Sequence, residues 1–462
     1  MIDFFSPDMK KASMLGEKRK TAMGLPAGDY HRVMGIWPPG RCDQCVVVWQ
    51  APTPQAETVT EKERSCSIMT HQDVLFSRLD AFKIELPSWG FADTGTRFGK
   101  FFQDAAAGDI EEKLADAGQV HRLTGVCPTV AVHTLWDFKK NQEAANVSAL
   151  AKKYGVAIGA INPNVFQNQE YKWGSITNRE ESIRRAAIKH ILDSVAIGRA
   201  VGSSYLSLWF ADGINYPGQA DIIARKHWAA AALQEVHAAM PPDMTMLVEY
   251  KPFEPAFYAT DIADWGMASH FARAAGPRAK VLVDTGHHYQ AVNIEQIVAW
   301  LLDENMLGGF HFNDRKYADD DLTMGSIDPY QIFRIFHEIE NYRFRTGQLP
   351  PLAYMVDQSH NLKPKIEAMI QTVDIAQQLY AKACLVDRKA LAMSQSKEDL
   401  VQSENILRGA FLTDVRPLLA DWRKARHLPV DPIEAHRQSG YEAKVAAARR
   451  KKYGNKGGGG YA

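Results

Sequence analysis

Short runs rich in β-branched and aromatic residues alternate with amphipathic stretches between about residues 81 and 360. In two of these stretches the apolar residues recur every three or four positions, as on one buried helix face: Ile188, Ile191, Leu192 and Val195, and Ile294, Ile297, Val298 and Leu301. Strands that alternate with helices are typical of parallel βα units. The predicted strands cover residues 82–86, 129–135, 157–162, 205–209, 245–249, 280–284, 309–313 and 352–357.

The number of predicted strands indicates the fold. Eight βα units over residues 81–360 match a (β/α)8, or TIM, barrel, which typically takes about 250 residues. The following residues, 361–450, show helical periodicity without a further strand, so we expect a helical C-terminal extension. Residues 451–462 are basic and glycine-rich, which predicts a flexible tail. The helices predicted in the extension cover residues 366–381, 397–410, 415–424 and 432–450.

Residues 1–70 differ from the rest of the chain, because they are proline-rich and weakly periodic. We expect an atypical, poorly defined N-terminal extension of low order. Cys42 and Cys45 form a CxxC pair, but no second Cys or His pair follows at zinc-finger spacing, which favours coincidence over a metal site. A start at Met69 is an alternative that would leave this extension outside the fold.

The composition narrows the classes of partner. Lys plus Arg and Asp plus Glu both number 54, so the net charge is zero and no overall field attracts nucleic acid or anionic lipid. No run approaches the roughly 18 uncharged apolar residues of a membrane span. Five cysteines spread over 462 residues suit a reducing compartment. We therefore expect a cytoplasmic protein that acts on a small neutral substrate, without nucleic-acid or membrane partners.

Barrel enzymes carry their active sites at the C-terminal ends of the strands, and here those ends are unusually polar. Taken singly, an Asp after a strand is as often a helix cap, and a strand His is more often a hydrogen-bonded core residue. Four such residues would nevertheless point into one bowl, where clustered carboxylates are costly unless a cation joins them. Carboxylate and imidazole ligands without cysteine favour Mn²⁺, Mg²⁺ or Co²⁺ over a structural zinc. The four residues are Glu249, Asp284, His311 and Asp357.

The same rim offers ligands for a second ion. Asp284 and His287 are three residues apart at one strand end, and Asp319 and Asp321 alternate so that both could reach one ion. Asp284 would then bridge two ions. Aromatic residues also lie near the strand ends, and flat rings pack against the C–H face of a sugar, so we expect a polyol substrate. These aromatic residues are Trp89, Phe98, Trp136 and Trp209.

Six ordered runs of residues carry a family resemblance. They are IELPSWGFADTGTRF, SLWFADGINYPGQ, EYKPFEPAFY, VLVDTGHH, GGFHFNDRKYADDD and MVDQSHN. These runs resemble bacterial L-rhamnose isomerases of the branch typified by pseudomonads and rhizobia, within the xylose-isomerase-like barrel superfamily. The similarity extends from about Phe82 to the end of the chain, whereas residues 1–70 do not resemble the helical N-terminal region of that family.

The resemblance implies a TIM barrel, a homotetramer and two divalent ions per subunit, commonly Mn²⁺, with Co²⁺ or Mg²⁺ as alternatives. It implies that Lys251 contacts the O1 end of the sugar and acts in catalysis with His287, Asp319 and Asp321. The ligands implied for a structural metal are Glu249, Asp284, His311 and Asp357; those implied for a catalytic metal are Asp284, His287, Asp319 and Asp321. The substrate-binding residues expected are His133, Trp136, Trp209, Ser359 and Phe98, the last lent to a neighbouring subunit's site.

The activity implied is the interconversion of L-rhamnose and L-rhamnulose by a metal-mediated hydride shift. Alternatives are another aldose isomerase of the same superfamily, a two-metal phosphodiesterase such as an abasic-site endonuclease, and a sugar-binding barrel without catalysis. The phosphodiesterase would need a basic groove, which the zero net charge does not favour. A nicotinamide-dependent dehydrogenase is disfavoured because no GxGxxG opens a βαβ unit.

Overall fold

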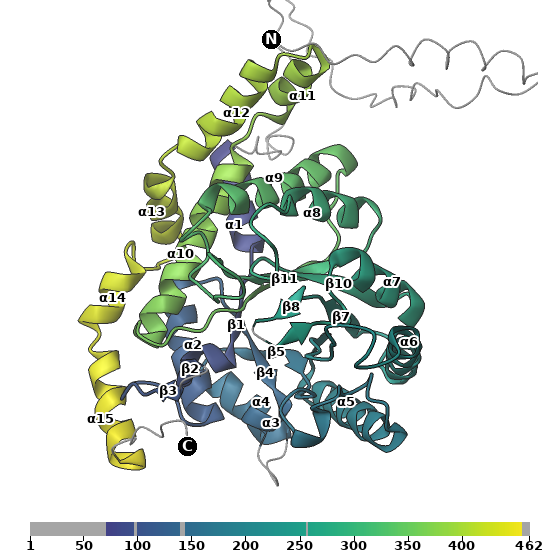
Figure 1. Cartoon of the computed structure of the whole chain (residues 1–462). Helices are drawn as coiled ribbons and strands as arrows, with labels where there is room; N and C mark the ends of the chain where they lie inside the picture. Colours follow the sequence, from purple (N-terminus) through teal and green to yellow (C-terminus); the bar gives the residue numbers. More distant parts are fainter. Residues whose placement is uncertain (1–70, 97–98, 139–143, 256, 455–462) are drawn as a thin grey trace, which may run out of the picture. The chain divides into compact units, whose positions relative to one another are not determined.

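A computed structural model describes residues 71–96, 99–138, 144–255 and 257–454. Its centre is a closed barrel of eight parallel strands in the spatial order β1-β12-β11-β10-β7-β6-β5-β4 (Figure 1). All eight predicted strands are present, and the (β/α)8 fold is confirmed. The barrel strands are β1 (Glu85–Pro87), β4 (Thr129–His133), β5 (Ala157–Asn162), β6 (Tyr205–Leu208), β7 (Thr245–Glu249), β10 (Ala279–Asp284), β11 (Leu307–Phe312) and β12 (Ala353–Val356).

Helices surround the barrel (Figure 1). Several of them begin where an aspartate side chain accepts a backbone N–H of the first turn, which satisfies a donor that the helix itself leaves open. The main helices of this layer are α2 (Ile110–Thr124), α4 (Ala144–Lys153), α5 (Glu181–Val201), α6 (Ile222–Ala239), α7 (Trp265–Ala275), α8 (Ile294–Asp303), α9 (Pro329–Thr346) and α10 (Lys365–Cys384), and α1 (His71–Ala81) precedes the first strand.

Shorter elements decorate the ends of the strands. They are the 3-10 turns η3 (Ser88–Phe91) and η4 (Gln169–Tyr171), the short helix α3 (Thr134–Asp137), and two hairpins, β2 (Thr94–Thr96) with β3 (Gly99–Phe101) and β8 (Phe253–Glu254) with β9 (Tyr258–Ala259). None of the helices that the structure describes is both long and apolar enough to cross a membrane.

The helical faces predicted from periodicity are the buried ones. In α5, Ile188, Ile191 and Val195 are buried, and Leu192 packs against the same core from a partly buried position. In α8, the face that carries Ile297 and Leu301 is buried in the same way. The main hydrophobic core therefore lies between the outer face of the barrel and the helices.

The C-terminal extension is helical, with three differences from the prediction. The helix Arg388–Ser396 was not predicted. The helix predicted over 397–410 begins at Leu400, and the helix predicted over 432–450 is two helices separated by Ser439 and Gly440. Gly440 has φ 64°, a left-handed conformation that favours glycine and ends a helix. The helices are α11 (Arg388–Ser396), α12 (Leu400–Leu412), α13 (Arg416–Ala425), α14 (Pro432–Gln438) and α15 (Tyr441–Tyr453).

The extension is anchored to the barrel helices by polar contacts. Arg449 of α15 is buried and pairs with the buried Asp116 of α2 at 2.9 Å. The tail predicted to be flexible from residue 451 is helical to Tyr453, because Lys452 Nζ donates hydrogen bonds to Asp109 Oδ2 (2.6 Å) and Glu112 Oε1 (2.9 Å) at the start of α2. The predictions for residues 1–70, including Cys42, Cys45 and Met69, for Phe98 and for residues 455–462 lie outside the described residues.

One buried carboxylate restricts the backbone opposite it. Glu85 of β1 lies inside the barrel, and its Oε1 accepts the backbone N–H of Ala160 at 2.9 Å. Burial raises the pKa of Glu85. A Cβ atom on Gly159 would lie 1.6 Å from Glu85 Oε2. Glycine is therefore required at position 159 for steric reasons.

We expect Gly159→Ala to destabilise the protein by about 1–3 kcal/mol, because the added methyl group displaces a buried, hydrogen-bonded side chain. Gly409→Ala in α12 is the matched control, since nothing lies within 4 Å of its added Cβ. This control should gain roughly 0.5–1 kcal/mol from the better helix former. The free energies of unfolding from urea titration compare the two variants, and equal values would contradict the steric assignment.

Candidate metal centre and pocket

The side chains that point into the barrel form layers, because strand residues alternate between two faces. One layer is apolar and contains Ala131, Ala160, Leu247, Leu282 and Met355. Two residues further along the same strands the side chains are polar: His133, Asn162, Glu249, Asp284 and Asp357. The apolar layer thus forms the floor of a polar site at the C-terminal ends of the strands.

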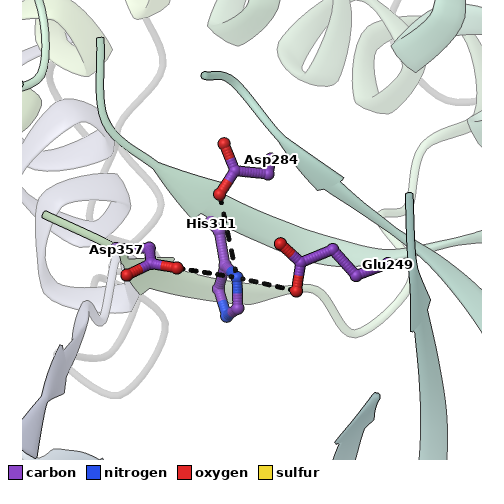
Figure 2. Close-up of side chains that lie close together, drawn as sticks. All are labelled: Glu249, Asp284, His311 and Asp357. Carbon is purple, nitrogen blue, oxygen red and sulfur yellow. Dashed lines mark ion pairs between the residues drawn. The ribbon is translucent and has the colours of Figure 1, made fainter. Parts of the chain in front are cut away.

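Four residues at this end of the barrel converge on one point, as Figure 2 shows. Glu249 ends β7, Asp284 ends β10, His311 lies in β11 and Asp357 follows β12. One possible ligand atom from each lies within 4.8 Å of the other three. His311 Nδ1 is 3.3 Å from Glu249 Oε2, 3.6 Å from Asp357 Oδ2 and 3.9 Å from Asp284 Oδ2. The structure therefore brings together the first predicted ligand group.

The environment of His311 fits a bound cation. Both ring nitrogens are buried, and neither has a hydrogen-bond partner in the described part of the chain. Burial would lower the pKa of this imidazole, but the carboxylates of Glu249 and Asp357 raise it to about 9. A divalent ion would supply the missing positive charge and take up a nitrogen lone pair, so the donor set suits a metal with oxygen and nitrogen ligands.

Asp284 is held rigidly within this group. Its Oδ1 accepts the backbone N–H of Gly286 at 2.6 Å and the side-chain amide of Asn313 at 2.9 Å. A Cβ on Gly286 would lie 2.1 Å from Asn313 Oδ1, so glycine is needed for this approach. Burial raises the pKa of Asp284 to about 7, although His287 opposes the shift. Asp284 does not cap a helix, and the sequence reasoning did not identify Gly286 or Asn313 as its supports.

His287 lies beside the cluster with one nitrogen fixed. Its Nδ1 is 3.0 Å from the carbonyl oxygen of Tyr250, which can only accept, so the proton of this hydrogen bond is on Nδ1. Its Nε2 then faces Asp319 Oδ1 at 3.1 Å. Burial would lower the pKa of His287, but Asp284 and Asp319 raise it to about 10. The second predicted ligand group therefore has a histidine nitrogen directed at one of its carboxylates.

Lys251 is the cation of the site. Its Nζ donates hydrogen bonds to Asp319 Oδ2 at 2.6 Å and to Glu254 Oε2 at 2.8 Å, and it lies 5.2 Å from the centroid of the Trp209 ring. Burial would lower the pKa of this amine, but the two carboxylates raise it above its ordinary value. Glu254 was missed by the sequence reasoning, although its position three residues after Lys251 in EYKPFE is a usable signal.

Asp319 and Asp321 lie on the loop between β11 and α9. Asp314 and Leu322 close its neck by exchanging two backbone hydrogen bonds of 2.9 Å each. Asp321 has φ 49°, a left-handed conformation that costs a non-glycine residue energy and marks functional loops. Burial and the charge of Asp319 raise the pKa of Asp321 well above its ordinary value.

The two predicted ligand groups differ in how closely they converge. Within the described residues, only the first group brings four ligand atoms within 4.8 Å of one another. In the second group His287 Nε2 faces Asp319 Oδ1, but Asp319 Oδ2 is engaged by Lys251. Asp321 faces the same pocket from the loop.

The cluster forms one wall of a pocket of about 230 Å³. The predicted residues His133, Trp136, Trp209 and Ser359 all line it, as does the rim aromatic Trp89; the prediction for Phe98 lies outside the described residues. Four further lining residues were not identified from the sequence, and of these Asn162 ends a barrel strand and could have been recognised by that position. The four are Asn162, Pro163, Phe166 and Ser207.

The opposite wall of the pocket is aromatic. The ring of His133 lies 4.0 Å from that of Trp136 and 4.7 Å from that of Trp89, centroid to centroid, and Phe166 lies 5.0 Å from Trp209. Burial lowers the pKa of His133 to about 3, so this imidazole is neutral at physiological pH. Rings beside neutral polar groups suit a ligand with both C–H faces and hydroxyl groups.

Several polar atoms of this pocket have no hydrogen-bond partner among the described residues. They are His133 Nδ1, Ser207 Oγ and Trp209 Nε1. An unsatisfied buried polar atom costs about 1–3 kcal/mol, and a hydroxylated ligand or bound water would relieve that cost. The pocket is therefore complementary to a polyol beside a metal ion.

Comparison with known proteins agrees with this geometry. The family model for the xylose isomerase-like TIM barrel matches residues 126–343. A probable sugar isomerase of Rhizobium meliloti is 41% identical over 394 residues, which cover 84% of this chain and 90% of the relative. A probable sugar isomerase of Mesorhizobium japonicum is 39% identical over 391 residues, with the same coverage of both chains.

Among solved structures, an L-ribulose 3-epimerase superposes with a TM-score of 0.50 at 12% identity, covering 69% of this chain and 97% of that one. This likeness concerns the fold alone. The relatives at about 40% identity are matched over 84% of this chain. The chain therefore belongs to the family of probable sugar isomerases built on a xylose isomerase-like TIM barrel, with a buried Glu/Asp/His cluster suited to a divalent metal.

Proposed function

We propose that the protein is a divalent-metal-dependent aldose–ketose isomerase that interconverts L-rhamnose and L-rhamnulose. The observation that carries the proposal is the cluster around His311, which adjoins a buried lysine in an aromatic-walled pocket. The choice of L-rhamnose rests on the six sequence runs that resemble L-rhamnose isomerases. The runner-up is another aldose substrate for the same reaction.

We assign two divalent ions to the site, with Mn²⁺ as the preferred metal and Co²⁺ or Mg²⁺ as alternatives. Glu249, Asp284, His311 and Asp357 would hold the first; Asp284, His287, Asp319 and Asp321 would hold the second. Such ions supply Lewis-acid polarisation of the sugar oxygens and lower the pKa of bound water.

The side chains of the pocket have separate roles in this proposal. Lys251 remains positively charged and would donate a hydrogen bond to the sugar O1, where negative charge builds up as hydride moves from C2 to C1. Trp209 and Trp136 would pack against the C–H face of the sugar. His133 and Ser359 would bond its hydroxyl groups, since His133 Nδ1 has no other partner in the described residues.

A two-metal phosphodiesterase is less compatible with the pocket. Phosphodiester substrates are anionic and need cationic side chains beside the metals. Among the described residues that line the pocket, Lys251 is the one lysine or arginine, and two carboxylates already engage it. A binding protein without catalysis is also disfavoured, since recognition of a sugar does not need a buried lysine near the proposed ions.

We further propose a homotetramer. Support comes from apolar side chains that are exposed on α11 and α12: Met393 at 55%, Leu400 at 70%, Val401 at 73% and Leu412 at 69% of their full accessibility. Exposed apolar surface of this kind marks an interface when it is contiguous.

The direct test is a set of assays on the purified protein before and after dialysis against EDTA. L-rhamnose, L-mannose and an abasic-site DNA duplex are the substrates. We expect turnover of L-rhamnose that EDTA abolishes and that Mn²⁺ or Co²⁺ restores. Full activity of the metal-free protein would reject metal dependence, and cleavage of the DNA would favour the phosphodiesterase.

The two proposed ions should respond differently to loss of single carboxylates. Asp284→Asn, in the convergent cluster and at the proposed bridge, should reduce tight Mn²⁺ binding by more than about 100-fold, beyond what loss of an outer hydrogen bond causes. Asp321→Asn should mainly weaken the second ion. Asp303→Asn, at an exposed position in α8, serves as the control. Metal content by mass spectrometry decides, and equal contents for Asp284→Asn and Asp321→Asn contradict the assignment.

Lys251→Met tests the role of positive charge at O1, because methionine keeps much of the apolar stem. An interaction that strengthens as charge builds on O1 should appear mainly in kcat. We expect kcat to fall by about 10²-fold or more with metal content unchanged, as for loss of an oxyanion donor. A near-normal kcat would remove Lys251 from the reaction.

A further inference from the structure

Asp137 is a buried carboxylate that lies outside the pocket and accepts three hydrogen bonds. Its Oδ1 accepts from Lys113 Nζ at 2.5 Å, and its Oδ2 accepts from Ser88 Oγ at 2.6 Å and from the backbone N–H of His133 at 2.9 Å. Asp137 is 1% exposed, Ser88 0% and Lys113 5%. The carboxylate and its two side-chain donors are therefore shielded from water.

These bonds join three segments that are far apart in the sequence. Ser88 begins the turn η3 after β1, His133 ends β4, and Lys113 lies in α2. Strands β1 and β4 are neighbours in the barrel, paired in parallel from Glu85 and Thr129. Asp137 therefore fixes the C-terminal end of one strand against the turn that follows the other.

The turn η3 and the end of β4, which Asp137 joins, supply residues to the aromatic wall of the pocket and contact the metal cluster. Trp89 follows Ser88, and its ring packs edge-to-face on that of His133. On its other side, Trp89 Nε1 donates a hydrogen bond of 2.8 Å to Asp357 Oδ1, while Asp357 Oδ2 faces His311. Since β1 lies between β4 and β12 in the barrel, Trp89 spans from the sugar wall to the metal cluster.

We propose that Asp137 is a positioning residue for this enzyme: it sets the location of His133 and Trp89 against the substrate and, through Trp89, the orientation of the Asp357 carboxylate toward the metal. The part that concerns the sugar rests on the proposed function, whereas the part that concerns the metal does not. Partners that orient metal ligands typically alter metal affinity or activity by about 10–100-fold when removed.

A carboxylate is required because every group that approaches Asp137 is a donor. In Asp137→Asn the amide NH₂ would face either Lys113 or the Ser88 and His133 donors, so at least one bond is lost. Ser88→Ala removes only the bond to the turn that carries Trp89 and leaves the buried ion pair intact. The second variant therefore separates positioning from the general cost of disturbing a buried charge.

The experiment measures Mn²⁺ affinity of the EDTA-treated full chain by isothermal titration without sugar, and KM and kcat for L-rhamnose with saturating Mn²⁺. We expect both variants to bind Mn²⁺ about tenfold more weakly and to raise KM by a similar factor, with a smaller change in kcat. Ser394→Ala is the matched control, because Ser394 is a buried serine of α11 whose hydroxyl donates a hydrogen bond to the helix carbonyl of Ala390.

If Asp137 had a merely structural role, its variants would behave like the Ser394→Ala control. The melting temperature would fall, while Mn²⁺ affinity and KM stayed at the wild-type values. Folded Ser88→Ala with Mn²⁺ affinity and KM within twofold of wild type overturns the proposal, even if Asp137→Asn does not fold. If the wild-type protein binds Mn²⁺ but turns over no aldose, the proposed function fails, and the Mn²⁺ affinities alone still decide whether Asp137 positions Asp357.

Discussion

Unbalanced negative charge at the mouth of the barrel is the constraint on which the site depends. Five carboxylates face a small buried region in which Lys251, His287 and His311 are the described groups that can carry positive charge, because burial keeps His133 neutral. The raised pKa values of His287 and His311 show the same imbalance, because these imidazoles retain protons that burial would otherwise remove. Protons on the imidazoles balance this negative charge only in part, whereas a divalent ion would balance more of it. The carboxylates are Glu249, Asp284, Asp319, Asp321 and Asp357.

The fold tolerates the cost of burying this cluster because the charged residues form a thin layer. Immediately beneath it lie small and aliphatic side chains, such as Ala131 and Leu282, and outside the strands lies the continuous core under the helices. Residues two positions apart on a strand share a face, so Glu249, Asp284 and Asp357 stand above Leu247, Leu282 and Met355. The scaffold that holds the ligands is therefore stabilised by burial of apolar surface and not by the site itself.

The strand-borne part of the site was predictable, whereas its supports were not. Glu249 and Asp284 end strands whose apolar runs are plain in the sequence, and barrel geometry then places them together. The bond from Asn313 to Asp284 depends on the close approach that Gly286 permits, which periodicity does not encode. The ordered end of α15 was not predicted either. Its basic residues are typical of a flexible tail, and their pairing with the acidic start of α2 is a long-range contact that the local sequence does not encode.

The two ligand groups differ in rigidity. Glu249, Asp284 and His311 belong to strands whose backbone bonds are fixed by the barrel, so their convergence needs little further support. Asp319 and Asp321 lie on a loop that supplies its own order, through the Asp314–Leu322 neck and a strained φ at Asp321. In the proposed assignment the ligands of the structural ion thus lie on or directly after strands, whereas Asp319 and Asp321 of the catalytic group come from the loop.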